Sequence, residues 1–300
     1  MVHTGSTRTF MWFCMGPVLL LLIIVAVAPV TLALIDSFRD LSLAMPSKRG
    51  QFVALDNYRD LLGSDGNFYR SLAHTAIFMM IAVPIELALG LLIALWINRE
   101  FTGRRLVLTI LMIPTMIAPV VVGMIWRFFL MPSFGVLTVY MNRLGLFEET
   151  SVFSGAITAF GALIIIDIWE WTPFIMLIML AGLSALPQAP IEAATIDGAS
   201  RWQIFRHIQL PMLFPLIVVA VMLRAIDASK VFDTIYVLTG GGPGNATEVI
   251  STFAYRTNFI RWDLGYGAAV CLVLAFASLV VAALFFKTVS GKPKPVEETS

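Results

Sequence analysis

Apolar residues fall into six long blocks separated by shorter polar stretches. Each block holds about 20 or more predominantly apolar residues, the length that a helix needs to span ~30 Å of hydrocarbon. The pattern therefore predicts an all-α polytopic membrane protein with six transmembrane helices. We expect these helices at residues 12–34, 72–97, 106–130, 156–183, 212–238 and 264–286.

The polar stretches divide the chain into three parts. Residues 1–70 hold a short tail, the first helix and a polar outer loop. Residues 71–286 form a core of five helices with a polar segment at 188–211, and residues 287–300 form a tail. Six helices place both ends on one side, and basic residues favour the cytoplasmic side. The basic residues of the 98–105 link and of the tail are Arg99, Arg104, Arg105, Lys287, Lys292 and Lys294.

Composition supports this class and excludes others. The chain is 59% hydrophobic and only 13% charged, which is outside the range of soluble proteins. The net charge of +1 says nothing about nucleic acid, but the sequence shows no basic cluster that would bind it, so we expect no nucleic-acid partner. Cys14 and Cys271 both lie in apolar blocks, so we expect neither a disulfide nor a metal site. The first apolar block is too long for the core of a signal peptide.

The polar segment before the fifth block is built as two short helices. Pro190 suits the first turn of a helix, because its missing N–H costs nothing there. Gly198 interrupts this helix, and Ser200 with Gln203 has the spacing of a capping box that starts a second one. We expect Pro211 to end the second helix.

The second short helix carries an aromatic face. Trp202, Phe205 and Ile208 recur every third residue and should share one side. Two interpretations follow from this pattern alone. The segment is either an amphipathic loop that lies on lipid headgroups or a plug that docks into a partner protein.

The residues of this segment carry a specific motif. Glu-Ala-Ala, then Gly, then Ile-x-Leu-Pro resembles the EAA motif of binding-protein-dependent ABC importer permeases. The matching positions are Glu192, Ala193, Ala194, Gly198, Ile208, Leu210 and Pro211. The resemblance implies a cytoplasmic coupling element that sits in a cleft of an ATPase subunit. Its residues would be Glu192, Ala193, Ala194, Asp197, Gly198, Ser200, Trp202 and Phe205.

The resemblance extends along most of the chain and points to the carbohydrate-uptake branch. The segments that match it are Trp171–Phe174, Ala181–Leu183, Pro187, Phe232–Asp233 and a Gly-Gly-Pro loop. It implies the ABC importer permease fold and alternating access in a bacterial cytoplasmic membrane, with both termini cytoplasmic. The implied partners are a second, different permease chain, two ATPase subunits and a periplasmic or lipid-anchored solute-binding protein.

The chain itself shows no catalytic grouping. The glycine run after the fifth block lacks the Gly-Lys-Ser/Thr ending of a phosphate-binding loop. We therefore expect no cofactor in this chain, and ATP with Mg²⁺ in the partner ATPase. The glycine run is either a simple turn or, as the resemblance implies, an outward loop that faces the binding protein; its residues are Gly240, Gly241, Gly242 and Pro243.

Charged residues recur every third position in the fifth block. Residues three apart are neighbours on a helix, and here the signs alternate. This ladder is a set of ion pairs that hold helices together, or a polar wall of the translocation pathway. It is also compatible with the ion relay of a proton-coupled carrier or channel. The four residues are Arg224, Asp227, Lys230 and Asp233.

The fourth block places acids beside tryptophans. Carboxylates accept hydrogen bonds from hydroxyl groups, and indole rings stack on the apolar faces of sugars, so this cluster is a candidate sugar site. The alternative is packing between helices. We predict a substrate pathway formed by Asp167, Trp169, Glu170, Trp171, Asp227, Lys230 and Asp233. Glu86 beside Pro84, and Arg127 beside Trp126, are weaker candidates.

Overall fold

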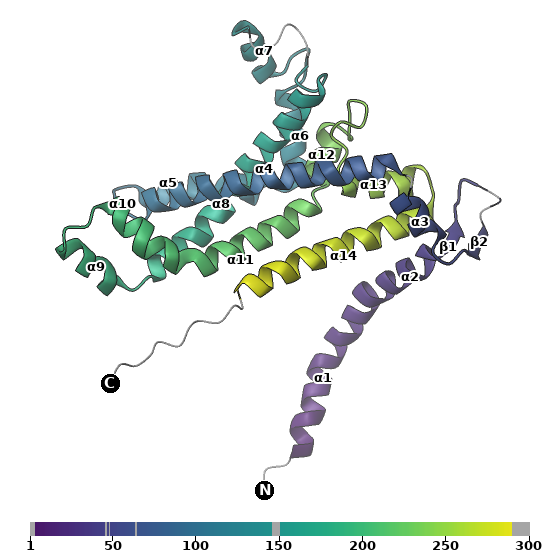
Figure 1. Cartoon of the computed structure of the whole chain (residues 1–300), viewed down its shortest axis with the longest axis horizontal. Coiled ribbons are helices and arrows are strands. Elements are labelled where there is room, and N and C mark those ends of the chain that lie inside the picture. Colours follow the sequence, from purple (N-terminus) through teal and green to yellow (C-terminus); the bar gives the residue numbers. More distant parts are fainter. Residues whose placement is uncertain (1–3, 46, 48, 64, 146–150, 290–300) are drawn as a thin grey trace. The chain divides into compact units, whose positions relative to one another are not determined.

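The computed structural model describes residues 4–45, 47, 49–63, 65–145 and 151–289 (Figure 1). Five helical segments in these ranges are long and apolar enough to cross a membrane, as predicted. A sixth candidate is a pair of shorter helices joined by a sharp bend. The five spans are Trp12–Ser37, Gly66–Ile97, Ala156–Ala185, Arg201–Leu238 and Leu264–Ala283. The last part of the predicted tail, residues 290–300, lies outside the described residues.

The prediction of a single helix over residues 106–130 is wrong, because this segment forms two helices. The chain forms α5 (Arg104–Met116) and α6 (Pro119–Phe129), and their axes differ by 93°. Proline disfavours the helical conformation of the residue before it. Ala118 accordingly has φ −64° and ψ 137°, and Ile117 is extended as well. Figure 1 shows α6 leaving the direction of α5 at this point.

The chain separates into two compact units, and the first comprises residues 1–68 and 253–276. Its helical segments are α1 (Thr4–Leu22), η1 (Ile23–Val27), α2 (Ala28–Ser37), α3 (Asp56–Gly63), η3 (Arg256–Ile260) and the first half of α14 (Leu264–Val289). Strands β1 (Arg39–Leu41) and β2 (Arg49–Phe52) pair antiparallel, with Asp40 opposite Gln51. The outer loop predicted at 36–70 therefore has structure of its own.

Polar contacts fix this loop. The buried Asn57 side chain donates hydrogen bonds to the carbonyl oxygens of Ser37 (2.8 Å) and Arg39 (2.9 Å). The Tyr266 hydroxyl donates to Asp65 Oδ2 at 2.6 Å. A buried amide with two partners ties α3 to the end of α2, because leaving it unpaired would be unfavourable.

The second unit comprises residues 69–252 and 277–300. It holds most of α4 (Gly66–Ile97), then α5, α6, α7 (Val136–Arg143), α8 (Ala156–Ala185), α9 (Gln188–Ile196), α10 (Arg201–Ile204), η2 (Phe205–Gln209), α11 (Leu210–Ser229), α12 (Asp233–Leu238) and the start of α13 (Ile250–Tyr255). Two apolar clusters form its core. One includes Phe78, Leu163 and Ile235, and the other includes Ile97, Met176 and Leu213.

Helices α4 and α8 approach closely at Gly90. A Cβ atom added there would lie 2.8 Å from Ile175 Cγ2 and 2.9 Å from the backbone nitrogen of Met176. The backbone nitrogen has little freedom to move aside. Glycine at this position therefore sets the distance between the two helices.

The expectation that Pro211 ends a helix is also wrong. Helical backbone continues through α10, η2 and α11, from Arg201 to Ser229. The π-helical turn η2 precedes Pro211, and the N–H of Leu210 bonds five residues back to the carbonyl of Phe205. This wider turn lets the chain accept a proline that lacks an N–H. The predicted helix over 212–238 breaks instead at residues 230–232, between α11 and α12.

Candidate functional site

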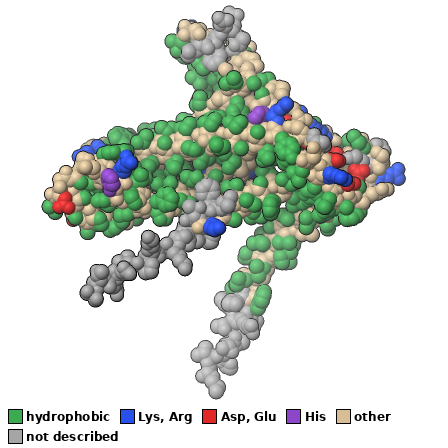
Figure 2. Space-filling model, in the orientation of Figure 1, with side chains coloured by type: hydrophobic (Ala, Val, Ile, Leu, Met, Phe, Trp, Pro, Cys, Tyr) green, Lys and Arg blue, Asp and Glu red, His purple; other side chains and the backbone are tan. Residues whose placement is uncertain are grey.

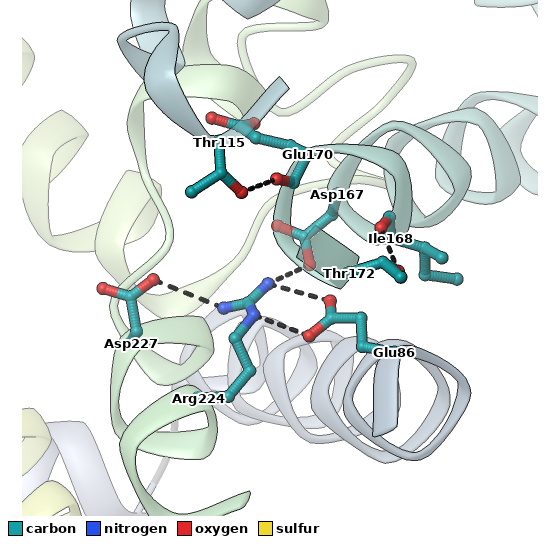
Figure 3. Close-up of polar contacts among 8 residues, drawn as sticks. All are labelled: Glu86, Thr115, Asp167, Ile168, Glu170, Thr172, Arg224 and Asp227. Atoms are coloured by element: carbon teal, nitrogen blue, oxygen red, sulfur yellow. Dashed lines mark hydrogen bonds and ion pairs between the residues drawn. The ribbon is translucent and has the colours of Figure 1, made fainter. Parts of the chain in front are cut away.

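A buried arginine is the centre of the polar interior of the second unit. Arg224 on α11 is 1% exposed, and its guanidinium group meets three carboxylates (Figure 3). Nε donates to Glu86 Oε2 at 2.7 Å, and Nη2 donates to Glu86 Oε1 at 3.1 Å. Nη2 also donates to Asp167 Oδ2, and Nη1 donates to Asp227 Oδ2 at 3.3 Å.

This ionic cluster joins α4, α8 and α11. On each helix the charged residue lies between positions that belong to the two apolar clusters, as Arg224 lies between Ala220 and Ala228. Glu86 is fully buried and Asp167 is 3% exposed, whereas the Asp227 side chain is 42% exposed. The bidentate pair with Glu86 is the geometry that makes arginine–carboxylate contacts strong. The cluster therefore fits the interpretation of ion pairs that hold helices together.

Aromatic rings border the cluster. The Trp171 ring lies 5.0 Å from Arg224 Cζ, a cation–π contact. Trp169, on the same helix, meets Trp126 of α6 edge-to-face with ring centroids 5.6 Å apart. Of the two predicted tryptophans, Trp171 thus packs against the arginine, and Trp169 packs against α6, the second helix of the bent pair.

Glu170 differs from the other acids of α8. It is 2% exposed, and its Oε2 has no hydrogen-bond partner among the described residues. Thr115 of α5 donates to the Glu170 backbone carbonyl at 2.5 Å, so this turn of α8 is also tied to the helix before the bend. Figure 3 shows the Glu170 carboxylate apart from the Arg224 guanidinium group, with no contact between the two.

The predicted charge ladder is only partly continuous. Arg224 and Asp227 are neighbours on α11, but Lys230 is the residue at which this helix ends and Asp233 begins α12. Both are exposed, and within the described ranges no ion pair joins Lys230 to either aspartate. The three-residue spacing fails because the helix breaks at 230–232.

The segment predicted for coupling forms two short helices, as expected. Gly198 has φ +82°, a left-handed conformation that favours glycine, and it separates α9 from α10. The Ser200 N–H donates to Gln203 Oε1 at 2.7 Å, and the Gln203 N–H donates to Ser200 Oγ at 3.3 Å. The capping box read from the sequence is confirmed.

Most of this segment faces outward. Glu192, Ala193 and Asp197 are exposed, Ala194 is half-buried, and Trp202 is 64% exposed. Trp202 and Phe205 lie together, with ring centroids 5.5 Å apart. Ile208 does not share their groove but lines a separate hollow beside Gly198 and His207, because the π-turn changes the angular step between residues.

The glycine run is an ordered turn. Gly240, Gly241 and Gly244 all have positive φ. The buried Thr247 hydroxyl donates to the Gly242 carbonyl at 2.6 Å and lies 2.7 Å from Thr239 Oγ1. The turn closes on its own residues, and the role of Gly240–Pro243 in facing a binding protein stays a prediction.

The sequence did not place Arg224 in the predicted pathway, and it gave Glu86 only a minor role. The signal was an arginine and a glutamate in otherwise apolar helices, since such charges need partners. Their sequence separation of 138 residues hid the pairing.

Comparison with known proteins identifies the family. Residues 86–292 match the family of the binding-protein-dependent transport system inner membrane component. The chain belongs to this family. The permease is 37% identical over 275 residues to a probable ABC transporter permease protein of Sinorhizobium fredii, covering 92% of this chain and 88% of the relative. Family membership favours binding-protein-dependent transport over a proton-coupled carrier or channel.

Two further relatives are named for sugars. A trehalose/maltose transport system permease protein of Thermococcus litoralis is 39% identical over 79% of each chain. A trehalose transport system permease protein of Mycobacterium tuberculosis is 35% identical over 99% of the permease and 95% of that protein.

Solved structures share the fold. A chain of a bacterial ABC transporter that imports the acidic polysaccharide alginate matches with a TM-score of 0.83 and 24% identity, over 96% of the permease and 98% of that chain. The same kind of transporter in complex with an alginate-bound periplasmic protein matches with a TM-score of 0.79. The predicted ABC importer permease fold is confirmed.

Proposed function

We propose that this permease carries a carbohydrate across the bacterial cytoplasmic membrane as one subunit of an ATP-driven importer. The observation that carries the proposal is the exposed helix pair α9–α10 with its EAA motif, which is continuous with the membrane helix α11. Relatives named for trehalose and maltose support the sugar class.

The energy source lies in other chains under this proposal. Two ATPase subunits bind ATP and Mg²⁺, and their movement reaches this chain through the exposed residues around Glu192 and Gly198. A second permease chain completes the pathway, and a solute-binding protein delivers the sugar from outside. Both termini and the α9–α10 pair then lie on the cytoplasmic side, as the basic residues of the 98–105 link favour.

Within the membrane, Glu170 is the acid best suited to meet the sugar. Its Oε2 is buried without a partner among the described residues, whereas Asp167 already accepts from Arg224. A buried carboxylate oxygen without a donor is unfavourable, and a sugar hydroxyl is a donor that would satisfy it.

The experiment is ATPase activity of the reconstituted complex, stimulated by the sugar-loaded binding protein. We expect Glu192→Ala to abolish stimulation while the ATPase subunits still co-purify. Glu100→Ala, an exposed acid outside the motif, is the matched control and should keep stimulation. If Glu192→Ala retains full stimulation, the helix pair does not carry the coupling and the proposal fails.

A further inference from the structure

A groove of about 570 Å³ lies where the end of α4 meets the helix pair α9–α10. One part of its wall is apolar, formed by Leu92 and Leu95 of α4, Ile191 of α9, and Ile204 and Phe205 after Gly198. A groove of this size holds a molecule much larger than an inorganic ion. Its apolar wall favours a ligand with a hydrocarbon portion.

The rest of the wall is basic. Arg99 follows the end of α4 by two residues, and Arg201 is the first residue of α10; both line the groove. Both are exposed, and neither guanidinium group has an ion-pair or hydrogen-bond partner among the described residues. No acidic residue lines the groove. The groove thus presents two available cations to an anion.

The groove lies at the ends of two candidate membrane spans. Ile97 ends a candidate span, and Arg201 begins another. Trp202 lines the groove, and Trp96 contacts Phe101 nearby, with ring centroids 5.3 Å apart. Tryptophan and arginine are typical of the headgroup level of a membrane. Figure 2 shows basic side chains at the end of the unit that carries α9 and α10, next to a largely apolar surface.

We propose that this groove binds one anionic phospholipid. Arg99 and Arg201 hold the phosphate, and an acyl chain lies along Leu92, Leu95 and Ile191. Basic pockets between membrane helices bind such headgroups. A free phosphate would use the arginines but leave the apolar wall empty, so the two surfaces together commit the site to a lipid.

Two residues of the coupling segment, Trp202 and Phe205, line the groove, so the lipid lies against one side of that segment. Glu192, Asp197 and Gly198 of the coupling segment do not line the groove. The lipid therefore contacts the inner side of the helix pair, between it and α4, and supports the pair from the membrane.

The test is native mass spectrometry of the purified full chain in detergent with added phosphatidylglycerol. Phosphatidylcholine with the same acyl chains and inorganic phosphate are the comparison ligands. We expect retention of phosphatidylglycerol to fall about fivefold for Arg99→Gln or Arg201→Gln, and about 30-fold for the double variant. Arg127→Gln, an exposed arginine outside the groove, is the matched control and should retain the lipid.

A second variant tests the apolar wall. Leu95→Trp fills the groove without changing charge, and we expect it to lose the lipid as the double variant does. Equal retention of both phospholipids, or displacement of phosphatidylglycerol by inorganic phosphate, would overturn the proposal. So would loss of the lipid when the ATPase subunits bind, because a protein side chain would then occupy the groove.

Discussion

At the scale of single residues, Arg224 decides how the charges of the membrane interior are arranged. Its guanidinium group makes four hydrogen bonds, to Glu86, Asp167 and Asp227, and its face lies against Trp171. Replacing Arg224 leaves Glu86 and Asp167 as buried carboxylates without a counter-charge. The resulting loss in the free energy of unfolding is much larger than the loss from removing an exposed ion pair.

We predict that Arg224→Met destabilises the permease by about 3–5 kcal/mol, because two carboxylates remain buried without their cation. Unfolding of the detergent-solubilised chain, followed by circular dichroism in a denaturant titration, measures the change. Lys230→Met removes an exposed lysine from the same segment and should change stability by about 0.5 kcal/mol or less. Equal stability of the two variants would show that the ionic cluster does not hold the helices.

The sequence indicated which residues needed partners but not which partners they had. An arginine at position 224 in an apolar segment required a counter-charge, and Asp227 was the local candidate. The stronger contacts come from α4 and α8, at separations of 138 and 57 residues. Spacing along one helix carries no information on such contacts, since they depend on how separate helices meet.

At the scale of elements, glycine sets the contact between α4 and α8. Ile175 and Met176 of α8 lie where a side chain at position 90 would be. These helices also carry Glu86 and Asp167, so their separation positions two of the three carboxylates that meet Arg224.

We predict that Gly90→Ala destabilises the permease by about 1–3 kcal/mol, because the new methyl group meets backbone of the neighbouring helix. Gly161→Ala is the matched control, since no atom lies within 4 Å of a Cβ added there. It should raise stability by up to about 1 kcal/mol through helix propensity. The thermal midpoint of each variant in detergent measures both effects, and a neutral Gly90→Ala would contradict the close contact.

Helix boundaries were harder to predict than helices. The apolar blocks located the spans, and Ser200 with Gln203 located a helix start, because both depend on local chemistry. Pro119 indicated a break in the helix, but the length of the apolar block favoured a single helix, and the bend was therefore not predicted. At Pro211 the error was the opposite: a helix end was predicted, but the helix continues, because the preceding π-turn accommodates a residue without an N–H donor. Distinguishing these two prolines requires the surrounding contacts.

At the scale of the whole molecule, the described charged residues of the membrane interior form no continuous relay. Glu86 and Asp167 are engaged by Arg224, and the helix break at 230–232 separates Asp233 on α12 from the turn of α11 that carries Asp227. Among the described residues, the charges of α11 and α12 therefore do not form one connected chain. A proton relay along this charge ladder would need such a chain.

We predict that proteoliposomes with this permease alone take up no sugar under an imposed proton gradient. The full complex with the partner permease, ATPase subunits and binding protein should take up sugar when ATP is supplied. Uptake of radiolabelled trehalose and maltose over time measures both. Proton-driven uptake by the single chain, above that of empty liposomes, would contradict the proposed function.

The order of the ionic cluster along the chain bears on how the protein is made. A ribosome delivers α4 and α8, with Glu86 and Asp167, before it delivers α11 with Arg224. Inserting an arginine into hydrocarbon without a partner is strongly unfavourable. An arginine that enters after Glu86 and Asp167 can pair with their carboxylates at once. Biogenesis of this permease therefore depends on the earlier helices remaining beside the translocon until the arginine-bearing helix joins them.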